Sequence, residues 1–407
     1  MGEVEKRLPL EGIRILSVEQ FITGPYCTQL LADAGAEVIK VERPGAGDPR
    51  RTMGPYLESP EGERVSGGFI EYNRSKKSLT LNMATEAGKE IFRKLAMEVD
   101  VVLENLRPGS MKKLGLDYEA LSVDNPRLIY AAISGFGQME EYAGPYQAWP
   151  ALDIVAEAMS GVMHIVGFAD RPPTYTIYGL ADIYSGLVNA YSIMLALFQR
   201  EMTGRGQMVD TSMYDSMVSL NERSVALHSL TGEIPVRGTE RVLGPRGAYR
   251  AQDGYVALNI PTDQMWARLA GAMEREDLIE DPRCLTGPDR AENDDFVRVV
   301  LEGWMATMTQ DEAVAHLQAA GVPAGPVQTA EDLFSCPQVA ARRMLVDVPH
   351  AKMGSVKMAR SPARLSGSPE VSPGAPPELG EHNREILGDL LGLPPGEIAA
   401  LRDAGVI

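Results

Sequence analysis

Residues 13–42 read IRILSVEQFITGPYCTQLLADAGAEVIKVE, and this stretch decides the fold class. Ile13–Val18 and Glu37–Glu42 are short apolar runs typical of buried strands, and Thr28–Ala34 between them has helical spacing. Gly35 follows as a helix stop. A strand, a short helix and a second strand in this order predict a βαβ unit with parallel strands.

The same alternation continues through the first half of the chain. Ala84–Val99 has helical spacing, and Ile183–Arg200 is the most apolar helical stretch, which we expect to be buried on most sides. Further strands are predicted at Ser78–Asn82, Val101–Asn105, Leu128–Ser134, Thr174–Tyr178 and Met208–Met213. This alternation predicts an α/β protein with a parallel sheet and helices on both faces.

The 407 residues exceed what one hydrophobic core usually holds, which indicates more than one domain. Composition shifts to glycine, proline and charge around Thr231–Pro245, where we place a domain boundary. Tyr249–Ile260 then reads as a β-hairpin. Pro349 to Pro377 is predicted to be a long surface excursion, and Glu381–Val406 reads as helices that need a surface to dock on.

Composition excludes several classes of protein. The net charge of −17 argues against nucleic acid or an anionic membrane as partner, since both need a basic surface. No apolar run reaches the ~20 residues that span a bilayer, so no membrane contact is expected. The three cysteines are far apart and the N-terminal residues form no apolar signal, so we expect a cytoplasmic protein without disulfides or zinc.

Standard catalytic motifs are missing from the sequence. There is no GxGxxG after a strand, no GxxxxGK[ST], no GxSxG and no HExxH, and the five histidines lack metal spacing. Basic residues do lie near strand ends, among them Arg43, Lys76, Arg107 and Lys113. Since ligands of open α/β sheets bind beyond the carboxyl ends of the strands, the basic residues that follow two of the strands could meet one polyanionic ligand, whereas Lys76 precedes a strand. Ordinary surface charge is the competing interpretation of each.

Asp182 directly precedes the predicted apolar helix. It could cap that helix, a common role for aspartate. The positive end of a helix also favours the anion and lowers the pKa of the carboxyl, so an ionised nucleophile is equally compatible with the local sequence. Further along, Gly244–Gly247 is either a linker or a lid over an active site.

Seven segments taken together resemble one family, the class III coenzyme A transferases, which include formyl-CoA transferase, carnitine CoA-transferase and the α-methylacyl-CoA racemases. They are LPLEGIRILSV, GPYCTQLLADAGAEVIKVERPGAGD, NRSKKSLTLNM, ENLRPGSMKKLGLDYEAL, residues 177–215, AAGVPAGPV and LGEHNREIL, in this order. The resemblance implies a doubly wound, Rossmann-like large domain, a smaller α+β domain and an interlocked dimer. We accordingly predict a large CoA-binding domain over 1–225, a small domain over 235–330, and a segment over 340–407 that returns to the large domain.

The resemblance also implies the site. Asp182 would attack the thioester of an acyl-CoA, giving a mixed anhydride and then an aspartyl-CoA thioester, with backbone N–H groups near Asp182 stabilising each oxyanion. No metal is implied, and no cofactor beyond coenzyme A as substrate. The partners would be an acyl-CoA, a carboxylic acid and a second copy of the chain in a homodimer. Positions that resemble the family's CoA contacts are Phe21, Ile22, Thr23, Arg43, Lys76, Asn105, Leu106 and Lys113.

Two departures from the family pattern narrow the activity. Leu152 stands where the racemases carry a histidine, which removes their base and favours transfer over racemisation. Asp153 and Ile22 stand where formyl-CoA transferase carries glutamate and glutamine, so the acyl group stays open. The alternatives are a 2-methylacyl-CoA racemase and a non-catalytic CoA-binding subunit of a hetero-oligomer.

Overall fold

The βαβ unit predicted from residues 13–42 is present as β1 (Arg14–Val18), α1 (Thr23–Asp33) and β2 (Glu37–Glu42). The structure is a computed structural model that describes residues 6–238 and 243–407. Helix α1 begins five residues earlier than predicted, because Pro25 lies in its first turn, where a missing N–H is tolerated.

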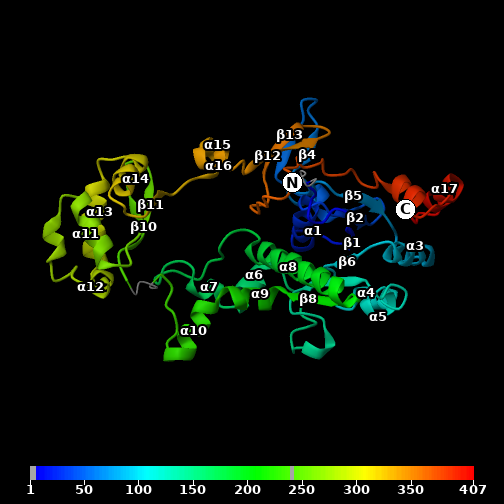
Figure 1. Cartoon of the computed structure of the whole chain (residues 1–407), viewed down its shortest axis with the longest axis horizontal. Coiled ribbons are helices and arrows are strands. Elements are labelled where there is room, and N and C mark those ends of the chain that lie inside the picture. Colours follow the sequence, from blue (N-terminus) through cyan, green and yellow to red (C-terminus); the bar gives the residue numbers. More distant parts are fainter. Residues whose placement is uncertain (1–5, 239–242) are drawn as a thin grey trace, which may run out of the picture. The chain divides into compact units, whose positions relative to one another are not determined.

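The chain divides into two units (Figure 1). Unit 1 comprises Met1–His164, Thr174–Ala226 and Arg343–Ile407, and unit 2 comprises Ile165–Pro173 and Leu227–Arg342. The boundary predicted within Thr231–Pro245 falls partly on residues 239–242, which lie outside the described residues.

Unit 1 is built on a sheet of six strands within the described residues, in the order β5-β2-β1-β6-β7-β8. All neighbouring pairs are parallel, as predicted. Numbered along the chain within this sheet, the order is 3-2-1-4-5-6, that of a doubly wound nucleotide-binding fold. The direction of winding reverses between β1 and β6, so a crevice is expected beyond their carboxyl ends. The four further strands are β5 (Lys77–Thr80), β6 (Val101–Glu104), β7 (Ile129–Ser134) and β8 (Met208–Ser212).

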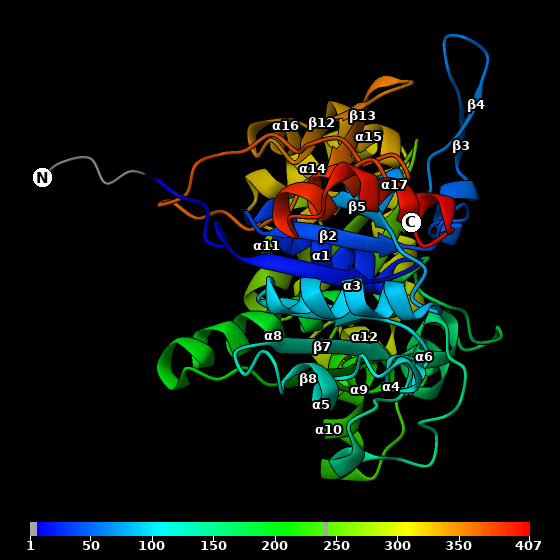
Figure 2. The same cartoon turned by 90° about the vertical axis from the view of Figure 1, so that its right-hand side faces the viewer.

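Helices cover both faces of this sheet. On one face, α1 and α8 (Leu180–Thr203) pack against side chains such as Ile15 and Val101. On the other face, neighbouring strand residues such as Leu16 and Val102 contact a second group of helices. That group comprises α3 (Glu86–Met97), α4 (Ser110–Leu114), α5 (Tyr118–Leu121), the π-helical η4 (Glu385–Leu390) and α17 (Pro395–Asp403). Figure 2 shows α3 and α17 together in front of the sheet.

The C-terminal tail packs on the sheet of its own chain. Ile386 and Leu387 are buried in the core beside α3. The Asn383 side chain accepts a hydrogen bond from the Thr80 amide at 2.9 Å, and the Val406 carbonyl accepts one from the Asn82 amide at 2.7 Å. The tail therefore completes the second face of the sheet.

Helix α8 departs from the expectation of burial on most sides. Its buried face, which includes Ala190 and Ile193, contacts α1 and the sheet. The opposite face carries Tyr191, Phe198 and Met202 at 62%, 68% and 68% exposure. Contrary to the expectation from the sequence, this helix is long and apolar enough to cross a membrane, but its buried face packs as a core helix does. The expectation of burial on most sides was wrong because the chain supplies packing partners on one side only.

One other local prediction was wrong, and one was incomplete. Thr174–Tyr178 forms no strand, because its polar backbone is held by Glu157, which accepts bonds from the Thr176 amide at 3.0 Å and hydroxyl at 3.1 Å. The excursion predicted at Pro349–Pro377 is mostly exposed or half-buried, as expected, but it contains β13 (Gly354–Ala359), which pairs with β12 (Leu345–His350) in an antiparallel hairpin. A proline is tolerated in β12 because the hairpin has open edges.

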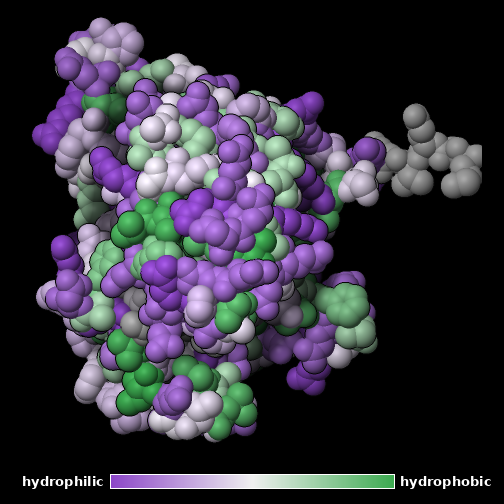
Figure 3. Space-filling model, turned by 90° about the vertical axis from the view of Figure 1, so that its left-hand side faces the viewer, coloured by the Kyte–Doolittle hydropathy of each residue, from purple (hydrophilic) through white to green (hydrophobic). Residues whose placement is uncertain are grey.

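Unit 2 is an α+β arrangement. The hairpin predicted at Tyr249–Ile260 forms β9 (Arg246–Arg250) and β10 (Tyr255–Asn259), and β11 (Ala324–Pro326) pairs with β10. Trp266, Leu301 and Leu317 pack its core from α11 (Asp263–Ala272), α13 (Asp294–Met305) and α14 (Gln310–Ala319). On the face drawn in Figure 3, hydrophilic residues are interspersed with smaller hydrophobic patches.

The remaining helices and strands of the described residues connect these layers. They are η1 (Pro49–Thr52), β3 (Tyr56–Glu58), β4 (Arg64–Ser66), α2 (Ile70–Asn73), η2 (Glu140–Tyr142), α6 (Asp153–Met159), α7 (Val162–Ile165), α9 (Met213–Leu220), α10 (Glu222–Thr231), η3 (Glu276–Ile279), α12 (Gly287–Glu292), α15 (Ala330–Ser335) and α16 (Pro337–Ala341).

Candidate active site

Asp182 lies at the carboxyl edge of the sheet, in the first turn of α8. The helix begins at Leu180 with Gly179 as its cap residue, at φ 82°, so Asp182 is not the N-cap considered from the sequence. Its Oδ1 accepts a hydrogen bond from the hydroxyl of Thr23, the first residue of α1. The two helix starts are therefore joined side chain to side chain.

Gly186 makes this approach of α1 and α8 possible. A Cβ at this position would lie 2.7 Å from the carbonyl oxygen of Thr23 and 3.2 Å from the ring of Tyr26. Because real Cβ atoms do not come so close to backbone oxygen, the helices can touch here only through a glycine. One helical turn separates Gly186 from Asp182, so the close contact sets the position of the carboxylate.

The side chain that accepts hydrogen bonds from the first amides of α8 is that of Asp153, at the start of α6. Its Oδ1 accepts from the amides of Ala181 at 2.7 Å and Asp182 at 3.4 Å, and its Oδ2 accepts from Gly179 at 3.3 Å. The open amides at a helix start are thus satisfied from another element. In this structure the amides of Gly179, Ala181 and Asp182 donate to Asp153, and stabilisation of an oxyanion by backbone N–H groups near Asp182 stays a prediction.

Burial raises the pKa of Asp182 to about 6. This value already includes a smaller upward effect of the Asp153 negative charge and the opposing effects of the Thr23 hydrogen bond and the Arg50 positive charge. The lowered pKa expected from the helix start was therefore wrong, because desolvation outweighs the helix end. At neutral pH most of the carboxylate is ionised yet poorly solvated, a state suited to nucleophilic attack.

Asn105, directly after β6, links that strand end to the turn after β1, where the sheet reverses its winding. Its Oδ1 accepts from the Gln20 amide at 2.8 Å, and its Nδ2 donates to the Gln20 carbonyl at 2.9 Å. The Leu106 amide donates to Glu104 Oε2 at 2.7 Å. Burial raises the pKa of Glu104 to about 7, and Gln138 Nε2 donates to its other oxygen at 2.6 Å. The side-chain amide of Asn105 thereby fixes the turn that carries Phe21, Ile22 and Thr23.

Phe21 and Ile22 lie in that turn. Phe21 has a φ of 62°, which is unusual for a bulky residue, and its side chain is exposed. Its amide donates to Asp48 Oδ1 at 3.3 Å. Ile22 is buried, and a Cβ added to Gly179 at the start of α8 would lie 3.4 Å from its Cδ1. Non-glycine residues at positive φ concentrate at functional sites, which fits the place of Phe21 in the turn between β1 and α1.

The three basic candidates lie in different surroundings. Lys76 is buried, and its Nζ donates to Glu19 Oε1 at 2.8 Å, the Pro25 carbonyl at 2.9 Å and Asn73 Oδ1 at 3.0 Å. Burial lowers its pKa to about 8. All three ammonium protons are therefore used within the fold. Arg43, directly after β2, and Lys113, in α4, are exposed and open to a ligand.

Gly244–Gly247 is held within unit 2. The Gly244 amide donates to the Gly287 carbonyl at 3.1 Å, and its carbonyl accepts from Arg290 Nε at 2.8 Å. The last two residues of the segment belong to β9. Hydrogen bonds thus hold this segment in place where the chain enters β9.

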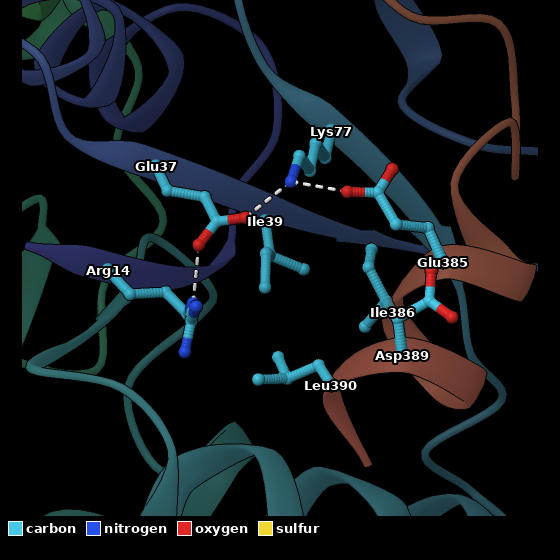
Figure 4. Close-up of a pocket in the computed structure, with 8 residues that line it drawn as sticks. All are labelled: Arg14, Glu37, Ile39, Lys77, Glu385, Ile386, Asp389 and Leu390. Carbon is cyan, nitrogen blue, oxygen red and sulfur yellow. Dashed lines mark hydrogen bonds and ion pairs between the residues drawn. The ribbon is translucent and has the colours of Figure 1, made fainter. Parts of the chain in front are cut away.

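A cavity of about 200 Å³ lies away from Asp182, at the amino ends of β1, β2 and β5 (Figure 4). Arg14, Glu37, Lys77 and Glu385 line it and are linked in that order by ion pairs. Ligands of this kind of sheet bind at the opposite edge. Among residues 6–238 and 243–407, no group of three His, Cys, Asp or Glu side chains is arranged to hold a metal ion.

Sequence reasoning missed the acidic residues that support the site. Asp48 Oδ1 accepts from both Phe21 and Arg50 amides, and Asp48 Oδ2 accepts from Lys40 Nζ at 2.7 Å. Glu19 accepts from Thr28 and from Lys76, as described above. The sequence shows Glu19 and Asp48 near strands that carry lysines. Which lysine each carboxylate binds is seen only in the structure.

The fold and these residues define an α/β enzyme of the doubly wound class with a candidate carboxylate nucleophile beyond its sheet. Residues 10–383 match the description "CoA-transferase family III", and the chain belongs to this family, which confirms the predicted resemblance and the prediction of an enzyme. It is 40% identical over 386 residues to succinyl-CoA:mesaconate CoA-transferase of Haloarcula hispanica, covering 93% of this chain and 96% of that protein. It is 37% identical over 406 residues to succinyl-CoA–D-citramalate CoA-transferase of Chloroflexus aurantiacus, covering 98% of each.

A solved structure shows the same fold. A CAIB/BAIF family protein from Brucella suis superposes with a TM-score of 0.84 at 34% identity, covering 95% of this chain and 100% of that one. The α/β fold with its parallel sheet is therefore that of the family.

Proposed function

We propose that the protein transfers coenzyme A from succinyl-CoA, or a similar acyl-CoA, to a dicarboxylic acid, with Asp182 as nucleophile. The observation that carries the proposal is a buried carboxylate, bound by Thr23, at a helix start on the carboxyl edge of a doubly wound sheet. The substrate class is supported by the names of the two relatives, since mesaconate and citramalate are both dicarboxylic acids.

The proposed reaction has four covalent steps. An Asp182 oxygen attacks the thioester carbonyl, the C–S bond breaks, and the CoA thiolate leaves a mixed anhydride. The thiolate then attacks the aspartyl carbonyl and releases the donor acid as a carboxylate. The acceptor carboxylate attacks the resulting aspartyl-CoA thioester, again releasing the thiolate. The thiolate finally attacks the acceptor carbonyl and restores the Asp182 carboxylate. One thioester and one carboxylate are consumed and formed, so the balance needs no redox group or metal.

The neighbouring residues have distinct tasks in this scheme. Thr23 orients the attacking oxygen of Asp182 by its hydrogen bond. Asp153 holds the first turn of α8 in place through its amides, and its charge keeps the Asp182 carboxylate basic. Coenzyme A would lie along the crevice at Asn105, with exposed Arg43 and Lys113 available to its phosphates. Lys76 would act indirectly, through its hydrogen bond to Glu19.

The direct test traps the covalent intermediate. Purified protein given succinyl-CoA and hydroxylamine should convert Asp182 to a hydroxamate, found by mass spectrometry of its peptide. Asp182→Ala should lose at least ~10⁴-fold in transfer rate, the scale at which loss of a nucleophile acts. Glu90→Gln, on the exposed face of α3, is the matched control and should behave as wild type. Transfer by Asp182→Ala at more than a few per cent of the wild-type rate would refute the proposal.

The same samples distinguish the alternatives. Incubation with a 2-methylacyl-CoA in deuterated solvent without an acceptor acid should leave the α-proton in place, and deuterium uptake would instead support a racemase. Transfer by the single purified chain would exclude a non-catalytic subunit.

We further propose that the protein is a homodimer in the cytoplasm and that a second copy covers the exposed face of α8. The large apolar side chains on that face continue along the helix from Leu187 at 49% exposure to Met202 at 68%, and a second copy carries the same surface. Phe198→Glu should shift the mass in sedimentation from dimer to monomer, whereas Val123→Glu, at an exposed valine elsewhere, should not. A wild-type protein that sediments as a monomer at micromolar concentration would contradict the proposal.

A further inference from the structure

Arg50, in η1, has a guanidinium with one unused donor group. The residue is 3% exposed, its Nε donates to the Gly68 carbonyl at 2.7 Å, and its Nη2 pairs with Glu71. Among the described residues, its Nη1 has no hydrogen-bond partner. This nitrogen is not one of the buried atoms left without a partner, so it reaches a solvent-accessible space. An arginine that is packed on one edge and open on the other is suited to bind an anion.

Ring contacts connect this guanidinium to the turn that binds the candidate nucleophile. Its central carbon lies 5.1 Å from the centroid of the Tyr72 ring, and Tyr72 stacks edge-to-face on Tyr26 at 6.1 Å. Tyr26 is in the first turn of α1, the turn in which Thr23 binds Asp182. The positive charge of Arg50 acts on Asp182 and lowers the pKa of its carboxyl, which is consistent with this proximity.

The backbone of Arg50 is fixed to the same turn. Asp48 Oδ1 accepts from the Arg50 amide at 3.0 Å and from the Phe21 amide at 3.3 Å. Lys40 holds the other oxygen of Asp48. The guanidinium is therefore carried on a support that also positions the β1–α1 turn, so its distance from Asp182 is set by the fold.

A dicarboxylic substrate presents a second charge close to the reacting carbon. While one end of a succinyl group forms the anhydride with Asp182, the other end remains a carboxylate that must be solvated or paired in a site poor in water. The nearby ammonium of Lys76 already donates all three protons to the fold. We propose that Arg50 binds, through Nη1, the second carboxylate of the dicarboxylic acid whose first end reacts at Asp182. This inference rests on the proposed function and adds to it the residue that selects the substrate class.

Donor and acceptor would use this contact in turn. After the first half of the reaction the donor acid leaves and the acceptor enters the same site, so one arginine suffices for both. Removal of a partner from such a charge-assisted contact usually lowers specificity by about 10²-fold or more.

The half-reaction gives the cleanest measurement because it contains a single acyl group. Rates of hydroxamate formation are compared for succinyl-CoA and butyryl-CoA, which have equal carbon number and differ in the terminal carboxylate. The wild type should prefer succinyl-CoA by about 10²-fold in kcat/KM. Arg50→Gln should bring this ratio near one by losing succinyl-CoA activity while keeping butyryl-CoA activity.

A matched variant separates recognition from support. Glu71→Gln removes the ion pair of Arg50 but keeps the guanidinium, and it should retain the succinyl preference. If Glu71→Gln loses the preference as Arg50→Gln does, or if Arg50→Gln slows both donors equally, Arg50 is a structural residue and the inference is overturned. Should Arg50→Gln fail to fold, Arg50→Lys carries the test, with a roughly tenfold reduction of the ratio expected.

The proposed function is tested apart from Arg50. An Asp182→Ala protein that still forms hydroxamate from both donors would overturn the nucleophile, and the inference with it. An inactive Asp182→Ala protein together with an unchanged ratio in Arg50→Gln would overturn only the role of Arg50.

Discussion

The two edges of the parallel sheet each carry a network of four charged residues, and the two networks differ in burial. The network around Glu19, which follows β1 at the carboxyl edge, comprises Glu19, Lys40, Asp48 and Lys76, all at most 3% exposed. Lys76 directly precedes β5 and reaches Glu19 with its side chain. At the amino edge, the side chains of Arg14, Glu37, Lys77 and Glu385 are 29–46% exposed and line the cavity of Figure 4. Both networks join segments far apart in the sequence, so their topology does not distinguish them.

Burial decides what each network contributes. An open ion pair is screened by water and is worth little, whereas a buried charge that loses its partner is strongly destabilising. The buried network supports the turn that carries Phe21 and Thr23, and the open network joins the tail to the sheet. The buried network thus positions the turn after β1, and the open network attaches the C-terminal tail to the sheet.

The comparison is tested most strongly by Lys76→Met. This change keeps the volume of the side chain but removes the closest cation of Glu19. The Glu19 carboxylate then keeps the Thr28 hydroxyl and the longer ion pair with Lys40, at 3.7 Å. We expect a loss of about 3–5 kcal/mol in the free energy of unfolding, measured by urea denaturation. The double variant Glu19→Gln/Lys76→Met removes both charges and should recover part of this loss. Equal stability of the Lys76→Met protein and the wild type would break the comparison.

Asp153→Asn sharpens the comparison at the site itself. The variant keeps an acceptor for the α8 amides but removes a negative charge that raises the pKa of Asp182. Since the ionised carboxylate is the reactive form, kcat/KM of the wild type should fall as the pH drops through about 6. In Asp153→Asn the pKa of Asp182 should be lower, and activity should persist to lower pH.

The pH profile of the half-reaction measures this shift. Destabilisation by about 1 kcal/mol is expected alongside, the usual weight of a helix cap. An unchanged midpoint in a folded Asp153→Asn protein would show that Asp153 acts on α8 only as a cap.

The smallest effect is expected for Lys77→Ala at the amino edge. Lys77 pairs with both Glu37 and Glu385, but all three side chains are in contact with water. The loss should be under ~1 kcal/mol and should shrink further in high salt, with transfer activity unchanged. Thermal unfolding at low and high salt checks this. A loss as large as that of Lys76→Met would mean that burial does not separate the two networks.

Strand positions could be predicted from the sequence because each strand is a short buried run. β2 was predicted with its observed ends, and β1, β5 and β6 within one or two residues. The start of α1 was missed because Gly24-Pro25 is typical of a turn when the next layer is unknown. The family and the class of reaction also followed from the sequence, through motifs spread over the whole chain.

The site could be predicted only in part, because the burial of a charged side chain leaves no pattern in the sequence around it. The pKa of Asp182 was expected to be low from its helix position, and the surrounding side chains raise it instead. Lys76 reads as a surface lysine beside Lys77, yet one is enclosed and the other exposed to water. The partnership of Asp153 with α8 spans 28 residues of chain and could not be inferred from spacing.

The path of the chain between the units has a consequence for recombination. The chain passes from one unit to the other after residues 164, 173, 226 and 342, so unit 2 is made of two separate segments. These segments touch within the unit, where Arg237 Nε donates to the Phe168 carbonyl at 3.1 Å. A chimera that took only residues 227–342 from a relative would pack that segment against residues 165–173 of this protein, to which it is not matched. Exchange of this unit, in evolution or in the laboratory, therefore has to move both segments together.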